Sequence, residues 1–264
     1  MSEIYPALAA RNMTIGYRGT PVADGLNMEI STGCVTALIG PNGVGKSTLI
    51  KTLTAEMPPL GGKVELMGKD IRSYSRKELS RLQSIVTTDP VAAGGLTVKE
   101  LVGLGRQPHT GFLGRMSDVD VNAVDRAMED VGIYHKRNSY VAELSDGERQ
   151  KTMIAKAIAQ DTPVIVLDEP FSFLDVAARI EILQLLNDIA AGGRCVLYSS
   201  HDVSQALRMA ACVILFTRDR KLVSGTPEEL VRTGAISTLF GSDKVVFSTA
   251  EKDFVGRDYI NKKF

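Results

Sequence analysis

Residues 40 to 48 read Gly40-Pro41-Asn42-Gly43-Val44-Gly45-Lys46-Ser47-Thr48, which fits the pattern G-x-x-x-x-G-K-S/T. In this pattern a glycine-rich loop lets backbone N–H groups approach the phosphates of a nucleotide closely. The lysine, Lys46, reaches the terminal phosphates, and the hydroxyl of Ser47 binds Mg²⁺. The alternative is a glycine-rich turn without a ligand. The stretch therefore predicts that the chain binds ATP or GTP together with Mg²⁺.

The flanking segments supply the setting that this motif requires. Val35 to Ile39 is a short apolar run, typical of a buried parallel strand, and a helical pattern opens at Thr48. Apolar runs and helical patterns alternate again later in the chain, with strands at 164–167, 195–198 and 213–216 and helices at 177–190 and 203–210. Strands that alternate with helices predict an α/β fold with a parallel sheet.

Two other regions depart from this alternation. Residues 1–30 alternate apolar and polar positions around a turn at 18–20, which predicts an antiparallel β layer. After a turn-rich segment at 89–95 the pattern becomes helical, at 98–104, 118–131 and 147–159. We therefore predict one domain. Its parts are an α/β core over about 1–88 and 161–240, an inserted helical subdomain over about 89–160, and an extension over 241–264 with a strand at 245–247.

Composition narrows the class of protein. Of the 264 residues, 44% are hydrophobic, and 31 Lys and Arg balance 31 Asp and Glu, so the chain has no electrostatic footprint for nucleic acid. Because no apolar run is long enough to span a membrane and no signal sequence is visible, we expect membrane association only through a partner. Cys34, Cys195 and Cys212 are widely spaced, which is typical of reduced core thiols in a cytosolic protein.

A second apolar run ends in two carboxylates. It reads Pro163-Val164-Ile165-Val166-Leu167-Asp168-Glu169-Pro170, which places Asp168 and Glu169 at the carboxyl edge of the sheet, where α/β proteins bind ligands. We expect Asp168 to hold Mg²⁺, directly or through water. Glu169 is the candidate general base that orients or deprotonates the attacking water. An acidic cap on the following helix is the alternative interpretation.

The stretch Ala142-Glu143-Leu144-Ser145-Asp146-Gly147-Glu148-Arg149-Gln150 contains a capping box formed by Ser145 and Glu148, which by itself predicts only a helix start. Combined with the motifs above, it resembles the Leu-Ser-Gly-Gly-Gln/Glu signature of ATP-binding cassette (ABC) transporter ATPases, over residues 10 to about 235. The resemblance implies a P-loop NTPase (RecA-like) core. In that family the signature of one subunit faces ATP held by the other subunit's phosphate loop, in a head-to-tail dimer. Ser145 and Gly147 match the signature, and Asp146 replaces its first glycine.

The resemblance also assigns roles outside these motifs. Tyr17 occupies the position of a ring that stacks on adenine, His201 that of the switch histidine that contacts the γ-phosphate, and Asp175 that of an acid in the dimer-contact loop. The structural alternatives are a half-exposed strand tyrosine, a structural histidine and a helix N-cap, respectively. His109 and His135 match no motif, and we expect them to be structural.

One family residue has no counterpart. The family has a glutamine where the core meets the helical lobe; it contacts Mg²⁺ and reports to the membrane subunits. Counting back from Leu96-Thr97-Val98 places Thr88 at that position with Asp89 beside it. A carboxylate oxygen binds the metal more strongly than a hydroxyl. Asp89 is therefore a candidate metal ligand in addition to Ser47 and Asp168, and Thr88 is the alternative.

The stretch from Leu96 to Arg115 is similar to importers of iron-siderophore, haem and cobalamin complexes, whose ATPases carry a Gly-Arg-x-Pro-His-x-Gly segment. The resemblance implies an ATPase subunit on the cytoplasmic face of the cell (inner) membrane. Its implied partners are a second copy of itself, transmembrane permease subunits and, indirectly, a substrate-binding protein. A non-transport cassette ATPase, such as one that assists iron-sulfur cluster assembly, is the alternative, and a nucleotide-binding module without turnover is a third class.

Overall fold

A six-stranded sheet forms the centre of the protein, in the order β10-β9-β3-β8-β7-β6. The computed structural model describes residues 5–87, 95–110, 114–242, 244–248 and 253–256. The strands of this sheet are β3 (Val35–Ile39), β6 (Gln83–Val86), β7 (Val164–Leu167), β8 (Cys195–Ser200), β9 (Cys212–Phe216) and β10 (Leu222–Gly225). β10 is antiparallel to β9, and the other strands are parallel. The predicted parallel α/β sheet is thus confirmed.

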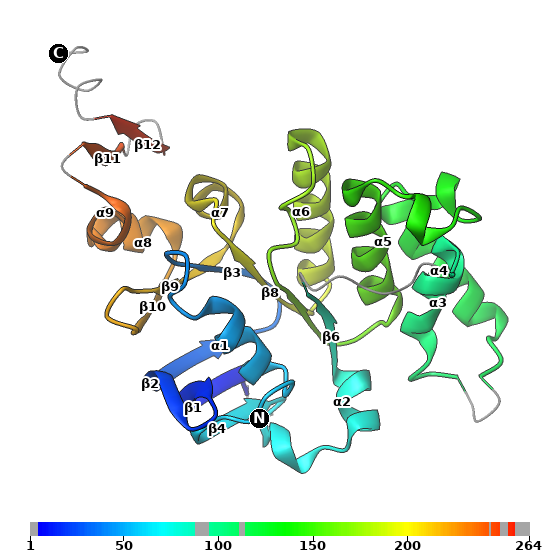
Figure 1. Ribbon diagram of the computed structural model, residues 1–264, viewed down its shortest axis with the longest axis horizontal. Coiled ribbons are helices and arrows are strands. Elements are labelled where there is room, and N and C mark those ends of the chain that lie inside the picture. The colour runs from blue at the N-terminus through cyan, green and yellow to red at the C-terminus, as the bar shows by residue number, and fades with distance from the viewer. Residues whose placement is uncertain (1–4, 88–94, 111–113, 243, 249–252, 257–264) are drawn as a thin grey trace.

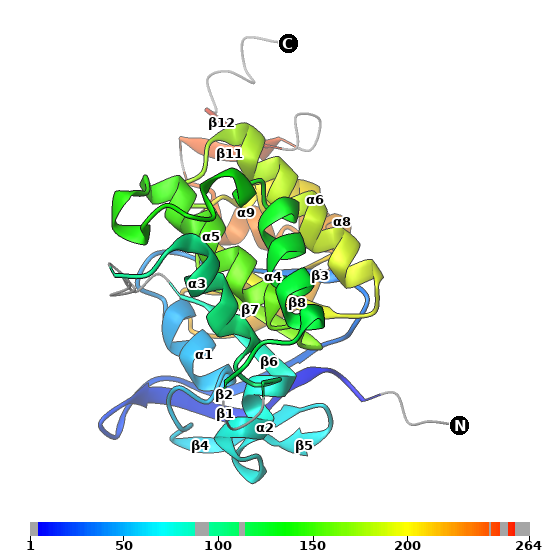
Figure 2. The ribbon, with the colours of Figure 1, turned by 90° about the vertical axis from the view of Figure 1, so that its right-hand side faces the viewer.

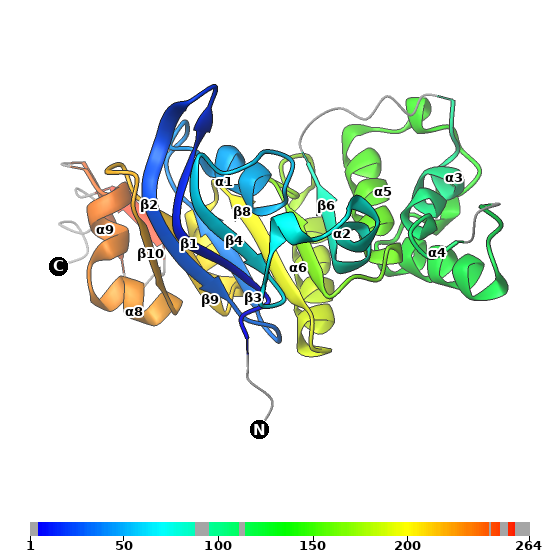
Figure 3. The same cartoon turned by 90° about the horizontal axis from the view of Figure 1, so that it is seen from below.

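An antiparallel layer covers one face of this sheet, with helix α1 (Lys46–Leu53) packed between them (Figure 3). The layer has the order β2-β1-β4-β5 and consists of β1 (Leu8–Tyr17), β2 (Thr20–Ile30), β4 (Gly61–Leu66) and β5 (Lys69–Asp70). The alternation of β2 explains its orientation, because Leu26 and Met28 are buried whereas Asn27 and Glu29 are exposed. The antiparallel strands predicted within residues 1–30 are confirmed as β1 and β2, whereas β4 and β5 were not predicted.

The helical lobe forms one end of the protein, at the right in Figure 1 and facing the viewer in Figure 2. It contains α3 (Val98–Gly103), the 3₁₀ turn η2 (Leu104–Arg106), α4 (Asp118–Asp130), η3 (Tyr134–Lys136), η4 (Val141–Glu143) and α5 (Asp146–Ala159). Leu101, Val124 and Ile154, one from each α-helix, are fully buried in a shared core. Each of the three α-helices starts with a capping box. Because such boxes are local signals, the predicted helices match the observed ones closely.

The Gly-Arg segment of the lobe fastens η2 to its neighbours. Gly105 packs so closely on α5 that a Cβ would lie 2.4 Å from the Lys156 carbonyl oxygen. Arg106 is buried, and its Nε donates to Asp120 Oδ1 at 2.9 Å while its Nη1 donates to the Ala159 carbonyl at 2.8 Å. Close packing thus explains the glycine at 105, and Arg106 is held by an ion pair and a backbone carbonyl.

Gln160, directly after α5, joins the lobe to the core. Its side-chain amide donates to the carbonyls of Ser80 at 2.7 Å and Gln83 at 2.9 Å, at the end of α2 (Arg76–Leu82) and the start of β6. The carbonyl oxygen of Gln160 lies 2.8 Å from His109 Nε2. His109 therefore makes a structural contact, as predicted.

The remaining helices pack on the opposite face of the central sheet from the β layer, together with the helical lobe. They are α6 (Val176–Ala191), α7 (Val203–Met209), α8 (Pro227–Arg232) and α9 (Ala235–Phe240). After α9 the chain forms a hairpin of β11 (Val245–Ser248) and β12 (Asp253–Gly256), at the C-terminal end in Figure 1. The strand predicted at 245–247 is thus part of β11. Within the described ranges, each helix is too short or too polar to cross a lipid bilayer.

The three cysteines lie on neighbouring strands of the central sheet. Cys34 precedes β3, and Cys195 and Cys212 begin β8 and β9; all three are free thiols. Burial raises the pKa of the Cys195 thiol to about 12, so this group is protonated and inert at neutral pH. Cys195 is a core thiol as predicted, whereas Cys34 and Cys212 are half-buried.

Candidate active site

The phosphate loop connects β3 to α1, and two of its glycines are required by the close approach of other atoms. A Cβ on Gly40 would lie 2.5 Å from the Phe216 carbonyl oxygen, and one on Gly45 would lie 2.9 Å from Val22. Gly45 also has a φ of 118° and is the N-cap of α1, which begins at Lys46, two residues before the predicted start. The loop is thus a cradle at a helix N-terminus, a geometry that binds phosphate anions.

Lys46 lies inside this cradle. Its Nζ donates to the carbonyl oxygens of Gly40 at 2.8 Å and Pro41 at 3.3 Å. Burial lowers the pKa of the Lys46 ammonium, and the charges of Glu169 and Asp168 act in the opposite direction. The structure therefore brings Lys46 and both predicted carboxylates into one electrostatic site.

Thr48, near the start of α1, contacts Tyr17, the residue predicted to stack on adenine. The Thr48 hydroxyl donates to the hydroxyl of Tyr17 at 3.1 Å, so the half-exposed ring at the end of β1 lies beside the phosphate loop. Ser47, between Lys46 and Thr48, is exposed, and its hydroxyl is open to a ligand. This arrangement fits an aromatic ring that stacks on a base while the loop holds the phosphates.

Ser199 on β8 holds the Asp168 carboxylate and the backbone of Glu169 at the end of β7. Its hydroxyl donates to Asp168 Oδ1 at 2.5 Å and accepts from the Glu169 backbone N–H at 2.8 Å. Ser199 is fully buried, and Asp168 is almost completely buried. Ser199 was not among the residues predicted from the sequence. Its only signal was a hydroxyl residue in an apolar strand, and its role appears only once β7 and β8 are known to be neighbours.

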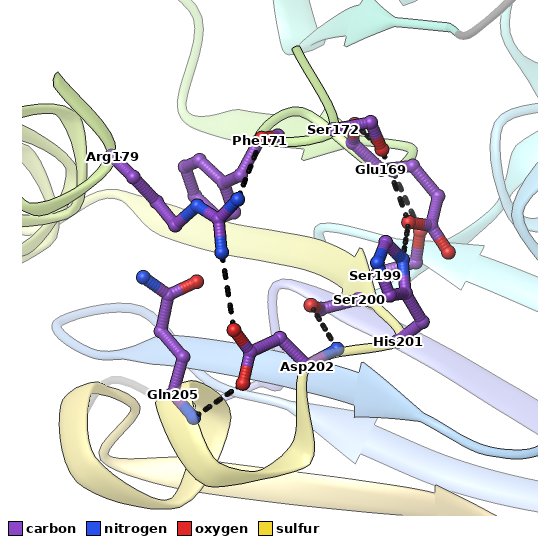
Figure 4. A pocket seen from close by; sticks show the side chains of 9 residues that line it. All are labelled: Glu169, Phe171, Ser172, Arg179, Ser199, Ser200, His201, Asp202 and Gln205. Atoms are coloured by element: carbon purple, nitrogen blue, oxygen red, sulfur yellow. Dashed lines mark hydrogen bonds and ion pairs between the residues drawn. The ribbon is translucent and has the colours of Figure 1, made fainter. Parts of the chain in front are cut away.

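Glu169 and His201 form a pair at the mouth of a small pocket (Figure 4). His201 Nδ1 lies 2.6 Å from Glu169 Oε2, and the histidine side chain is 62% exposed. The Glu169 backbone has a φ of 49°, which is a strained conformation for a residue other than glycine. Strained backbone conformations of this kind cluster at functional sites. The predicted general base, Glu169, and the histidine predicted to contact the γ-phosphate, His201, thus face each other.

The signature segment forms the predicted helix start. The Ser145 hydroxyl accepts from the Glu148 N–H at 3.3 Å, and the Glu148 carboxylate accepts from the Ser145 N–H at 2.9 Å. The first helical residue, Asp146, pairs with Arg149 Nη1 at 2.8 Å. This ion pair partly neutralises the carboxylate at the helix N-terminus.

The signature lies next to the predicted dimer-contact loop. A Cβ on Gly147 would lie 3.0 Å from the Phe173 carbonyl oxygen. Asp175 is the N-cap of α6 and accepts from the Ala178 N–H at 2.8 Å. It therefore has the helix-capping role given above as the structural alternative to a role in dimer contact. Both Figures 1 and 3 place α5 in the helical lobe, away from α1. The chain thus does not bring its own signature and phosphate loop together.

Comparison with known proteins identifies this arrangement. A family profile described as "ABC transporter" matches residues 23–172, which include the phosphate loop, the signature and the Asp168–Glu169 pair. The chain belongs to the ABC transporter family. It is an ATP-binding, ATP-hydrolysing subunit.

Relatives of this ABC transporter ATPase match it over nearly its full length. The ferric enterobactin transport ATP-binding protein of Escherichia coli is 38% identical and covers 91% of the chain and 89% of its own length. The iron(3+)-hydroxamate import ATP-binding protein of Bacillus subtilis is 37% identical, with coverages of 90% and 88%. Both are transport subunits, which supports the importer interpretation over the iron-sulfur assembly alternative.

Solved structures agree on the fold of the cassette. A metal-chelate type ABC transporter in an inward-facing conformation has a TM-score of 0.76 at 25% identity, covering 95% of each chain. An ATP-binding subunit of another ABC transporter has a TM-score of 0.78 at 24% identity, covering 98% of this chain and 100% of its own. The predicted P-loop NTPase fold is thereby confirmed.

The residues of this ABC transporter ATPase fit Mg²⁺ held mainly by a nucleotide. Ser47 and Asp168 offer hard oxygen ligands beside the glycine cradle, and Mg²⁺ takes one or two such side chains together with substrate phosphates. Among the described residues, no group of three or more His, Cys, Asp or Glu is arranged to hold a metal without a nucleotide. Thr88 and Asp89, the candidates for the missing glutamine, lie outside the described residues.

Proposed function

We propose that the chain is the ATPase subunit of an importer for iron-siderophore, haem or cobalamin complexes. It works as a head-to-tail dimer around two Mg²⁺-ATP, drives a membrane permease between its inward-open and outward-open forms, and resets on hydrolysis. The proposal is carried by the near full-length match to ferric enterobactin and iron-hydroxamate transport subunits. The chain would act on the cytoplasmic face of the membrane, held there by its permease.

In this proposal the site residues divide the chemistry among them. Lys46 and the loop N–H groups bind the β- and γ-phosphates, and Ser47 and Asp168 hold Mg²⁺, which neutralises charge on the phosphates when bound. Glu169 accepts a proton from the attacking water. His201 holds the Glu169 carboxylate through Nδ1 and contacts the γ-phosphate. Ser199 fixes the Asp168 carboxylate and the backbone from which the Glu169 side chain extends.

A second copy of the chain would complete each site. Ser145 is exposed at the start of α5, where a partner's ATP can reach it. Beside it, around Asp175, Phe173 is 57% exposed, Val176 72% and Ile180 41%. Exposed apolar side chains gathered at a functional loop are typical of a protein interface. Head-to-tail pairing would cover them in both copies.

This dimer predicts how turnover depends on concentration. We expect the steady-state ATPase rate with Mg²⁺ to rise more steeply than linearly with the concentration of chain, because a monomer lacks half of each site. Phe173→Asp should shift that rise to higher concentration by about tenfold, the effect of losing one buried aromatic contact. Val223→Asp, at an exposed position on β10, is the control. A strictly linear rate would contradict the dimer.

The helical lobe offers a surface for the permease. A cavity of about 540 Å³ opens between α3, η2 and α4. Its apolar wall consists of Leu96, Leu104, Met116 and Val121, with Lys99 and Glu100 at the same opening. An apolar groove with a few charged groups suits an amphipathic helix from a partner protein. We assign it to a cytoplasmic helix of the permease.

A substitution in this groove should uncouple the chain from transport. Leu104→Asp places a charge on the apolar wall, so we expect cells that carry only this variant to take up iron-siderophore complexes at least about tenfold more slowly. Val119→Asp, in the same lobe but outside the cavity wall, should support normal uptake. The measurement is uptake of radiolabelled iron-siderophore, with the thermal unfolding of each purified variant as a check on folding. Normal uptake with Leu104→Asp would contradict this docking site, and normal uptake without the chain would contradict the importer.

A further inference from the structure

The C-terminal hairpin contacts the helix that follows His201. Asp253, the first residue of β12, accepts a hydrogen bond from the Ser204 hydroxyl through Oδ1, and its Oδ2 lies 3.3 Å from Arg208 Nη2. Ser204 and Arg208 are one turn apart on α7 and share a face. A single carboxylate from the hairpin thus holds one side of this short helix.

The hairpin presents this carboxylate from a fixed platform. The ring of Phe254 packs edge-to-face against Phe240 at the end of α9, with centroids 6.1 Å apart, and against Phe247 of β11 at 5.2 Å. Phe247 and Phe254 also pack against the main core. The bond from Ser204, followed by the Phe254 N–H and the charge of Arg208, lowers the pKa of Asp253, so this carboxylate is ionised at neutral pH.

α7 leads directly back to the active site. The helix begins at Val203, and its N-cap Asp202 accepts from the Gln205 N–H at 2.9 Å and pairs with Arg179 of α6 at 3.1 Å. His201 is the residue before this cap, and its ring reaches Glu169 (Figure 4). The placement of the first turn of α7 therefore determines where the His201 ring points.

We propose that Asp253 is a positioning residue for ATP hydrolysis. By holding Ser204 and Arg208 it fixes α7, and through α7 it keeps the His201 ring against the Glu169 carboxylate. The hairpin of β11 and β12 would thus act on the active site from outside the cassette core. The effect on turnover rests on the proposed roles of His201 and Glu169, whereas the effect on the position of the His201 ring does not.

The position of the ring can be measured directly. The chain contains three histidines, so ¹H–¹³C NMR of the imidazole groups gives few signals, and His201→Ala assigns the one that matters. We expect Asp253→Asn and Ser204→Ala each to shift or broaden the His201 signal, leaving those of His109 and His135 in place. Ser204→Ala changes no charge, so a shift in both variants reports a movement of α7. Asp219→Asn, an exposed carboxylate between β9 and β10, is the control for loss of charge.

The kcat and KM for ATP distinguish a role of Asp253 in positioning His201 from a role in stabilising the fold alone. We expect Asp253→Asn to lower kcat for ATP by about tenfold, because small misplacements of a reacting group are costly. The KM for ATP should change less than about twofold, because the phosphate loop is untouched. An unmoved His201 signal in both variants would overturn the proposal, as would a moved signal with unchanged kcat when His201→Ala itself lowers kcat. Wild-type turnover in His201→Ala would instead contradict the proposed role of His201, and the ring signal would still report the coupling to Asp253.

Discussion

Glu169→Gln should lower ATP turnover by about 10²- to 10⁴-fold, the usual contribution of a general base. Glutamine keeps the size of the side chain and a hydrogen-bonding oxygen for His201, but it cannot accept the proton of the attacking water. ATP binding should be preserved, because the phosphate loop and Lys46 are unchanged. Steady-state hydrolysis and equilibrium binding of ATP measure the two effects separately.

The same variant should also trap the dimer. Glu169 lies in one electrostatic site with Lys46 and Asp168, so its negative charge opposes the γ-phosphate, and glutamine removes that repulsion. We therefore expect an ATP-dependent dimer in sedimentation experiments with Glu169→Gln. Glu228→Gln on α8 is an exposed substitution of the same kind and should behave as the unaltered protein. Near-normal hydrolysis in Glu169→Gln would refute the assigned base.

Asp120→Asn should destabilise the protein by about 3–5 kcal/mol, because it leaves the buried charge of Arg106 without its partner. The Ser117 hydroxyl bond, then the Ser117 N–H and finally Arg106 lower the pKa of Asp120 to about 2. A carboxyl whose pKa is lower in the folded state stabilises that state above its unfolded pKa of about 3.8. This contribution should be lost as the pH falls from about 4 to about 2.

Urea unfolding of matched variants tests two explanations for the loss of stability in Asp120→Asn. Either the fold requires the ion pair itself, or the loss comes from the buried Arg106 charge left without a partner. Replacing both partners with apolar residues, in Arg106→Met with Asp120→Leu, should cost clearly less than Asp120→Asn alone, because no buried charge is left uncompensated. Some loss should remain, since Asp120 also completes the capping box with Ser117. A double variant as unstable as the single one would show that the fold requires the pair itself.

Contiguous motifs made much of this protein predictable. The phosphate loop, the apolar run that ends in Asp168 and Glu169, and the capping box at Ser145 are each encoded within a few residues. Three capping boxes likewise fixed the helix starts of the lobe. The missed strand β4 begins with two glycines, and Gly62 has a φ of 70°, so its sequence pattern is weak.

Contacts between distant segments were not predictable in this way. Ser199 contacts Asp168 and Glu169 because β8 lies beside β7 in the sheet. The order of the strands in the sheet also differs from their order in the chain, since β3 lies between β8 and β9. The pairing of Arg106 with Asp120 likewise requires η2 to meet α4. For Asp253, the sequence predicted only a strand at 245–247, and the contact of Asp253 with α7 depends on how α8 and α9 place the hairpin.

The anchoring of α5 by Gln160 has a mechanical consequence. α5 spans 14 residues, about 21 Å, from the signature at its start to the hydrogen bonds of Gln160 with the core just after its end. η2, beside the cavity assigned to the permease, is fastened near that anchored end by Gly105 and Arg106. If the lobe turned about this anchor, the helix would act as a lever arm with its pivot at Gln160. A rotation of about 10° around that pivot would carry Ser145 through about 4 Å, so a small push on the lobe becomes a displacement large enough to engage or release a phosphate.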